Sequence, residues 1–155
     1  MDEKTKIAVK IKITGIHKTF DGSTYGRPEE TCEEYYGALG KRGTGIYLIY
    51  ETKETDGIII SNMLKFSPAS HELKRTSTLH RGTITSPASV LVYKKDQRCE
   101  GFYTTPYGRL DASIFTKELT FEEKGSDLTC RISGVMEINN SPVSEFELKI
   151  EAVSI

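Results

Sequence analysis

Hydrophobic and polar residues alternate along much of this chain with a period of two, as in a β-strand that buries only one face. The pattern is clearest near the start, at residues 6–14, and near the end, at residues 145–152. In both runs isoleucine and other apolar residues occupy every second position, and most positions between them are lysine, glutamate or threonine. Both segments are therefore predicted to be amphipathic strands with one wet face.

The segments between these two are predicted to contain more strands. Residues 46–51 are apolar on both faces and are expected in the middle of a sheet. Turn signals such as Asp56-Gly57 and Asn139-Asn140 separate the strands, and residues 21–28 are predicted to form a loop. The additional strands are predicted at residues 31–39, 58–66, 72–76, 90–93, 99–104, 109–116 and 128–138.

Three places depart from simple alternation. Gly15 followed by Ile16 breaks the phase of the first strand, which predicts a bulge or a bend. Residues 77–89 are predicted to be an irregular strand with an inserted loop. Gly134 lies in the apolar row of residues 128–138, which fits the tight curvature of a closed barrel.

About ten strands and no segment of helical period indicate an all-β protein. The hairpin-after-hairpin order favours a closed or nearly closed antiparallel meander barrel of about 8–10 strands, with a two-sheet sandwich as the open alternative. A chain of 155 residues is expected to form a single domain over residues 1–155.

Composition limits the classes of partner. With 21 basic and 22 acidic residues and no basic stripe, nucleic-acid binding is not expected. No apolar run has the roughly 20 residues that a membrane helix needs, and no signal peptide is recognisable. The three cysteines, Cys32, Cys99 and Cys130, contain no CxxC motif and are read as free thiols. A cytoplasmic protein is therefore expected.

No residue pattern predicts catalysis. His17, His71 and His80 have no metal-ligand spacing, so no metal site is predicted. The chain has neither a GxSxG nucleophile motif nor a phosphate-binding loop, and no cofactor is expected. Glu33 and Glu34 point to opposite sides of their strand, so one carboxylate must face inward. It is expected at an edge or barrel mouth, with a buried, paired acid in a ligand cavity as the alternative.

Residues 103–109 form the most unusual stretch. Pro106 stops the hydrogen-bonded ladder and Gly108 permits a positive φ, so the segment is predicted to be a stiff corner between two strands. The alternative is that Tyr103, Tyr107 and Arg109 gather at a barrel mouth and grip an anionic small molecule.

This corner carries a resemblance to a known family. Tyr103-x-Thr-Pro-Tyr-Gly-x-Leu110, followed by Thr116, resembles the signature of the YwiB-like family, a bacterial domain of unknown function. Tyr47-Leu-Ile-Tyr-Glu51, then Asp56-Gly57 and Leu64-Lys65, are similar in order and spacing. The resemblance implies a calycin-type, lipocalin-like β-barrel and no established activity. It also implies a family arginine, matched here by Arg75 or Arg81.

Three functional hypotheses remain open. The first is a non-catalytic barrel that binds a small apolar or amphipathic ligand. The second is a protein-interaction module, or a homodimer, that uses the exposed sheet face around Tyr47 and Ile49. The third is an enzyme, which no sequence feature favours. The candidate ligand-binding residues are Asn62, Arg75, Tyr103, Thr105, Tyr107 and Arg109.

Overall fold

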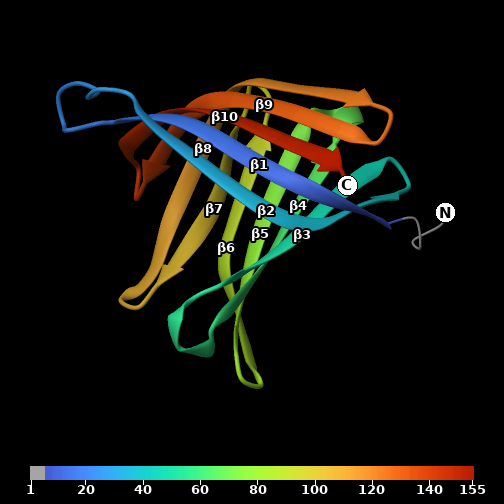
Figure 1. The fold of residues 1–155 in the computed structure, drawn as a ribbon. Helices are drawn as coiled ribbons and strands as arrows, with labels where there is room; N and C mark the ends of the chain where they lie inside the picture. Colours follow the sequence, from blue (N-terminus) through green and yellow to red (C-terminus); the bar gives the residue numbers. More distant parts are fainter. Residues whose placement is uncertain (1–5) are drawn as a thin grey trace.

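The chain forms a single antiparallel β-sheet that closes on itself as a barrel (Figure 1). A computed structural model describes residues 6–155. Neighbouring strands follow chain order around the barrel, and β1 completes it by pairing with β10. This topology confirms the predicted antiparallel meander barrel and shows that the sandwich alternative was wrong. The strands are β1 (Lys6–Thr19), β2 (Glu29–Arg42), β3 (Gly45–Lys53), β4 (Ile59–Ser67), β5 (Glu72–Arg81), β6 (Ile84–Lys94), β7 (Arg98–Thr105), β8 (Gly108–Lys124), β9 (Asp127–Ile138) and β10 (Ser141–Ser154).

Strand β1 shows how the alternating sequence builds the barrel wall. Val9, Ile11 and Ile13 are buried, whereas Lys10 and Lys12 between them are exposed. The same alternation in the other strands directs apolar side chains inward, where they form one core. This core consists of Val9, Ile11, Ile13, Leu39, Ile46, Leu48, Tyr50, Leu64, Phe66, Leu73, Leu91, Tyr93, Ala112, Ile114, Leu119, Leu128, Cys130, Ile132, Phe146, Ile150 and Ala152.

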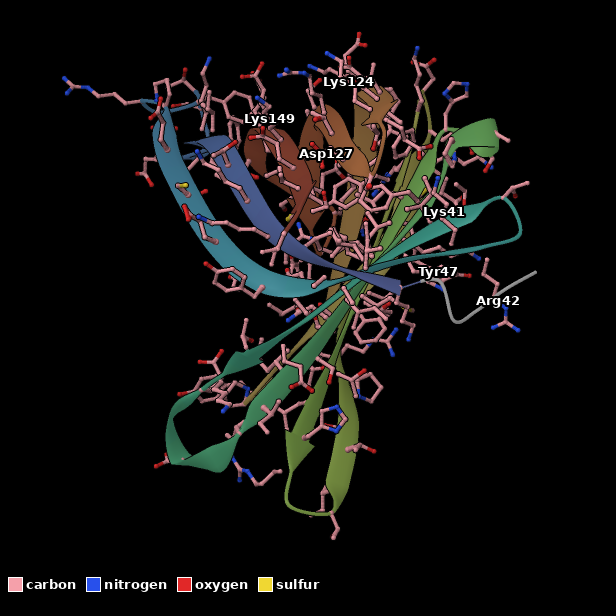
Figure 2. The ribbon with its side chains drawn as sticks, turned by 45° about the vertical axis from the view of Figure 1, so that its right-hand side comes forward. Lys41, Arg42, Tyr47, Lys124, Asp127 and Lys149 are labelled. Carbon is pink, nitrogen blue, oxygen red and sulfur yellow. The ribbon has the colours of Figure 1, made fainter. Side chains whose placement is uncertain are left out.

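We call the end of the barrel that carries the β2–β3, β4–β5, β6–β7 and β8–β9 turns the closed end. Its interior is lined with apolar side chains, and Phe66 of β4 meets Phe121 of β8 edge to face at 5.5 Å. A hollow of about 250 Å³ lies at its rim, beside Ile7, Leu39 and Leu128. At the rim, Lys41 Nζ lies 2.8 Å from Glu123 Oε2 and joins β2 to β8. Figure 2 shows Lys41 near the β2–β3 turn and Lys124 at the β8–β9 turn.

We call the opposite end, with the β1–β2, β3–β4, β5–β6, β7–β8 and β9–β10 connections, the open end. There β2 and β3 separate, because they pair only between residues 37–42 and 45–50. The β1–β2 hairpin then runs to one side while the β3–β4 hairpin turns away from it (Figures 1 and 2). The barrel wall is therefore incomplete at this end.

Two local predictions were wrong. Residues 77–89 contain no inserted loop: β5 and β6 form a tight hairpin around Gly82, and their ladder has one register shift after Ser77. Gly15 marks no bulge, since β1 keeps an unbroken register with both β2 and β10. A side chain at Gly15 would instead meet Thr31 Oγ1 at 2.9 Å and His17 Nε2 at 2.7 Å. The glycine therefore makes room inside the barrel, and the predicted bulge is absent.

Gly134 is required by a close approach of two strands. A Cβ atom at this position would lie 2.2 Å from the carbonyl oxygen of Phe115 on β8. The β8–β9 register shifts directly beside this contact, between Thr116 and Glu118. The glycine therefore lets β8 bend tightly against β9, in line with the curvature predicted from its place in the apolar row.

Candidate functional site

The interior of the open half contains a cationic side chain, Arg75 of β5. Its neighbours in the ladder, Leu64 on β4 and Leu91 on β6, are both buried, so Arg75 also points into the barrel. The hydroxyls of Tyr50 and Tyr93 lie close enough to the guanidinium to interact with its charge. These phenols stabilise the cation by their dipoles without neutralising its charge.

The pKa values of these groups reflect this environment. Burial alone would lower the pKa of Arg75, but the surrounding Tyr93, Tyr50 and Tyr103 more than offset this effect and raise it above its ordinary value. Arginine is in any case charged at all physiological pH values. Burial raises the pKa of Tyr103 to about 12 and also raises that of Tyr50. At neutral pH the cluster is therefore one buried cation among neutral phenols.

Glu33 lies in the lining of the same cavity as Arg75, on the part of β2 that β3 does not pair with. The Tyr35 hydroxyl donates a hydrogen bond to the Glu33 carboxylate, and the Tyr35 ring stacks on the Tyr50 ring at 4.4 Å. Burial and this carboxylate together raise the pKa of Tyr35. Glu33 points inward from β2 but is exposed to solvent. The sequence-based expectation of a wet carboxylate at the barrel mouth is therefore confirmed.

Among the ion pairs of residues 6–155, none joins Arg75 to a carboxylate. A buried charge is normally paired, because its desolvation costs several kcal/mol. Beside the guanidinium lies a cavity of about 150 Å³. Glu33, Arg75, Tyr93, Tyr103 and Met136 line it, together with Ile13, His17, Thr31, Leu91, Ser144, Phe146 and Leu148. The arrangement can hold a small anionic group against Arg75.

Three of the six residues proposed from the sequence lie inside the barrel. Arg75 and Tyr103 line the cavity, and the Tyr103 hydroxyl lies 3.9 Å from the sulfur of Met136. Asn62 faces inward on β4, where its Oδ1 accepts a hydrogen bond from Ser77 Oγ at 2.9 Å. Asn62 is therefore satisfied by its neighbour and is not among the residues that line this cavity.

The other three lie at the β7–β8 hairpin, outside the cavity. Thr105 Oγ1 donates to the carbonyl of Gly108 at 2.7 Å and accepts from the Tyr107 N–H at 3.2 Å. The Tyr107 side chain is fully exposed. Arg109 faces outward and stacks on Phe102, 3.8 Å from the ring centroid. The expectation that Tyr103, Tyr107 and Arg109 gather at one mouth was wrong, and the turn is the stiff corner that Pro106 and Gly108 predicted.

The sequence interpretation did not single out Tyr35, Tyr50 and Tyr93 as partners of Arg75. Tyr50 and Tyr93 occupy the inward phase of strands β3 and β6, so alternation marked them only as core residues. The available signal was an arginine in the inward phase of β5, two residues after the buried Leu73. A charged residue in an apolar row calls for a polar environment inside the barrel.

Other polar clusters are less suited to chemistry. Ser61 Oγ and His80 Nε2 lie 2.9 Å apart on the outer face of β4 and β5. Over residues 6–155, no carboxylate bonds this histidine to complete a triad. In the same range no group of histidine, cysteine and carboxylate side chains could hold a metal ion. None of the helical segments described is long and apolar enough to cross a membrane.

Comparisons with known proteins agree with the fold. The ywiB protein from Bacillus subtilis, known from a crystal structure, superposes with a TM-score of 0.77 at 14% sequence identity, over 98% of this chain and 94% of the other. This similarity establishes the barrel architecture and no activity. No curated protein matches the chain in sequence. Residues 11–150 match the family model described as domain of unknown function (DUF1934), and the chain therefore belongs to that family.

Proposed function

We propose that the barrel binds a small amphipathic acid at its open end, with Arg75 as the partner of the acid group. The observation that carries the proposal is a half-buried guanidinium that points into the barrel beside tyrosine hydroxyls and forms no ion pair with a carboxylate of residues 6–155. Folding has to offset the desolvation of this charge. A ligand carboxylate or phosphate would supply the missing negative charge through paired hydrogen bonds.

The size of the cavity limits which part of the ligand enters. Drug-sized ligands occupy roughly 300–1,000 Å³, whereas the hollow beside Arg75 measures about 150 Å³. The acid group and a few attached atoms fit there. The remainder of the ligand would leave through the open end, passing Tyr103 and Met136. The apolar core of the closed half, with Leu48, Leu64 and Phe66 almost completely buried, argues against a ligand that extends through the whole barrel.

The test is a set of matched acids and neutral analogues. We expect straight-chain carboxylates from acetate to octanoate to raise the melting temperature in proportion to occupancy, and the matching primary amides to have no effect. Arg75→Leu should fold, because replacing a buried charge by an apolar side chain is often neutral or stabilising, but it should lose the response. Arg109→Leu is the matched control, since Arg109 lies outside the cavity on Phe102. An unchanged response in Arg75→Leu, or no response in the original protein, would refute the proposal.

A second candidate function is an interaction surface on the outer face of β2, β3 and β4. A surface hollow of about 460 Å³ has Ala38, Gly40, Tyr47, Ile49 and Met63 as its floor, with Lys6, Lys41 and Arg42 at its edge. Figure 2 shows Arg42 and Tyr47 close to the β2–β3 turn. The basic edge favours an acidic partner over a second copy, whose identical patch would bring like charges together. Light scattering that shows a stable homodimer through this face would contradict this candidate.

A further inference from the structure

One edge of strand β2 has no strand beside it at the open end. Residues Glu29–Tyr36 pair with β1 on one side. On the other side β3 joins only from Gly37 onward, and it then turns away with β4 (Figures 1 and 2). Within residues 6–155, every second residue of this eight-residue segment therefore directs its main-chain N–H and C=O groups away from β1, to an edge where no strand pairs with them. Such an edge is a template for another extended chain.

The edge lacks several of the usual protections against strand addition. The β1–β2 register runs through residues 29–36 without a bulge, and no proline interrupts it. The protection present is charge, from Glu29, Glu30, Glu33 and Glu34. A second copy of this edge would bring eight carboxylates into one two-stranded patch, so self-pairing is disfavoured. A partner strand with basic side chains would be favoured instead.

The same segment of β2 forms one wall of the Arg75 cavity. Thr31 and Glu33 point inward from it and line the cavity together with Arg75. Glu30, Cys32 and Glu34 alternate with them on the outer face. Side chains of an added strand would alternate in the same way. Every second side chain would therefore face the cavity, and the others would lie beside the outer glutamates.

We propose that the free edge of β2 binds an extended peptide by strand addition. In this arrangement an inward carboxylate of the peptide meets Arg75, and an outward lysine or arginine side chain meets Glu30, since Glu34 already pairs with Lys10 of β1 at 3.2 Å. This inference rests on the proposed function, because it identifies the acid as part of a peptide. The carboxylate is either an aspartate or glutamate side chain or the peptide's own C-terminus, since both present the same group to the guanidinium.

The test uses two synthetic octapeptides that alternate lysine and valine. One carries a single aspartate in the valine phase and blocked ends, and the other carries a free C-terminal carboxylate and no aspartate. Fluorescence anisotropy measures binding to the whole chain, and hydrogen exchange locates it. We expect at least one peptide to bind and to slow amide exchange within residues 29–36, while the central amides of β1 and β10, which are already paired, do not change.

Four controls separate the parts of the contact. Changing the peptide's acid to its amide, or Arg75→Leu in the protein, should weaken binding by about tenfold or more, because each removes a charge-assisted hydrogen bond. Two N-methylated versions of the peptide differ in which alternate peptide bonds carry the methyl groups. Methylation of the bonds that face β2 should abolish binding, and methylation of the other set should leave binding unchanged. Arg109→Leu should bind as the unaltered protein does.

The failures of the two proposals can be told apart. If octanoate raises the melting temperature through Arg75 but neither peptide binds, the small-acid proposal stands and strand addition is refuted. If a peptide binds without protecting residues 29–36, or both N-methylated peptides bind equally, strand addition is also refuted. If neither Arg75→Leu nor loss of the peptide's acid changes the affinity, the carboxylate contact is refuted.

Discussion

The two halves of this barrel use the same strands for different purposes. In the closed half the inward positions are apolar and almost completely buried, as with Leu48, Leu64 and Phe66. In the open half the same inward rows contain polar residues. Asn62 lies next to Leu64 in the inward row of β4, and Arg75 lies next to Leu73 in the inward row of β5. The closed half gains stability from burial. The open half keeps a charge whose desolvation is unfavourable and which the proposed acid would offset.

The largest expected effect comes from removing a core side chain in the closed half. Phe66→Ala should lower the free energy of unfolding by about 3–5 kcal/mol, since it leaves a cavity and deletes the edge-to-face contact with Phe121. Met63→Ala is the matched control on the same strand, because Met63 faces outward and is 38% exposed. It should change stability by less than about 1 kcal/mol. Urea unfolding followed by circular dichroism measures the unfolding free energy of both variants. Equal losses would show that the buried interior of the closed half stabilises the fold no more than its outer face does.

Titration at alkaline pH should separate the two halves by the pH at which each begins to lose stability. Burial raises the pKa of Cys130, in the closed half, from 9.0 to about 12, and that of Tyr103, in the open half, from 10.0 to about 12. A folded pKa above the unfolded value means that the folded state holds the proton more tightly. The stabilisation is therefore complete below the unfolded pKa and is lost as the pH rises through the folded pKa.

The expected result is a different onset for each variant. Cys130→Ala should make the fall in unfolding free energy less steep from pH 9 upward, whereas Tyr103→Phe should do so only above pH 10. Urea titrations at half-unit intervals between pH 7 and pH 11, under reducing conditions, measure the slopes. Cys99 and Tyr50 also have pKa values raised by burial, so each variant should remove only part of the slope. Identical slopes in both variants and the original protein would contradict the assignment.

The same contrast explains what the sequence could predict. Alternation predicted the strands and their order, because most inward positions of the closed half follow the period of two. The hairpin at Gly82 was missed because Ser77, Ser86 and Ser89 gave no apolar row to follow. The proximity of Arg75 to Tyr50 and Tyr93 could not be predicted, since it depends on the relative stagger of β3, β5 and β6, which alternation within one strand does not set. Tyr107 and Arg109 were chosen for residue type alone, and the two-residue turn directs both outward.

The smallest effect should come from the ion pair that closes the rim at the closed end. Lys41 and Glu123 meet at 2.8 Å, but their side chains are 53% and 41% exposed. Water and salt screen such a pair, and exposed pairs contribute about 0.2–1 kcal/mol. A double-mutant cycle with Lys41→Met and Glu123→Gln should therefore give a coupling energy in this range that shrinks in 1 M salt. A larger, salt-resistant coupling would mean that charge as well as apolar packing holds the closed end together. The distinction between an apolar closed half and a charged open half would then apply to the barrel interior but not to its rim.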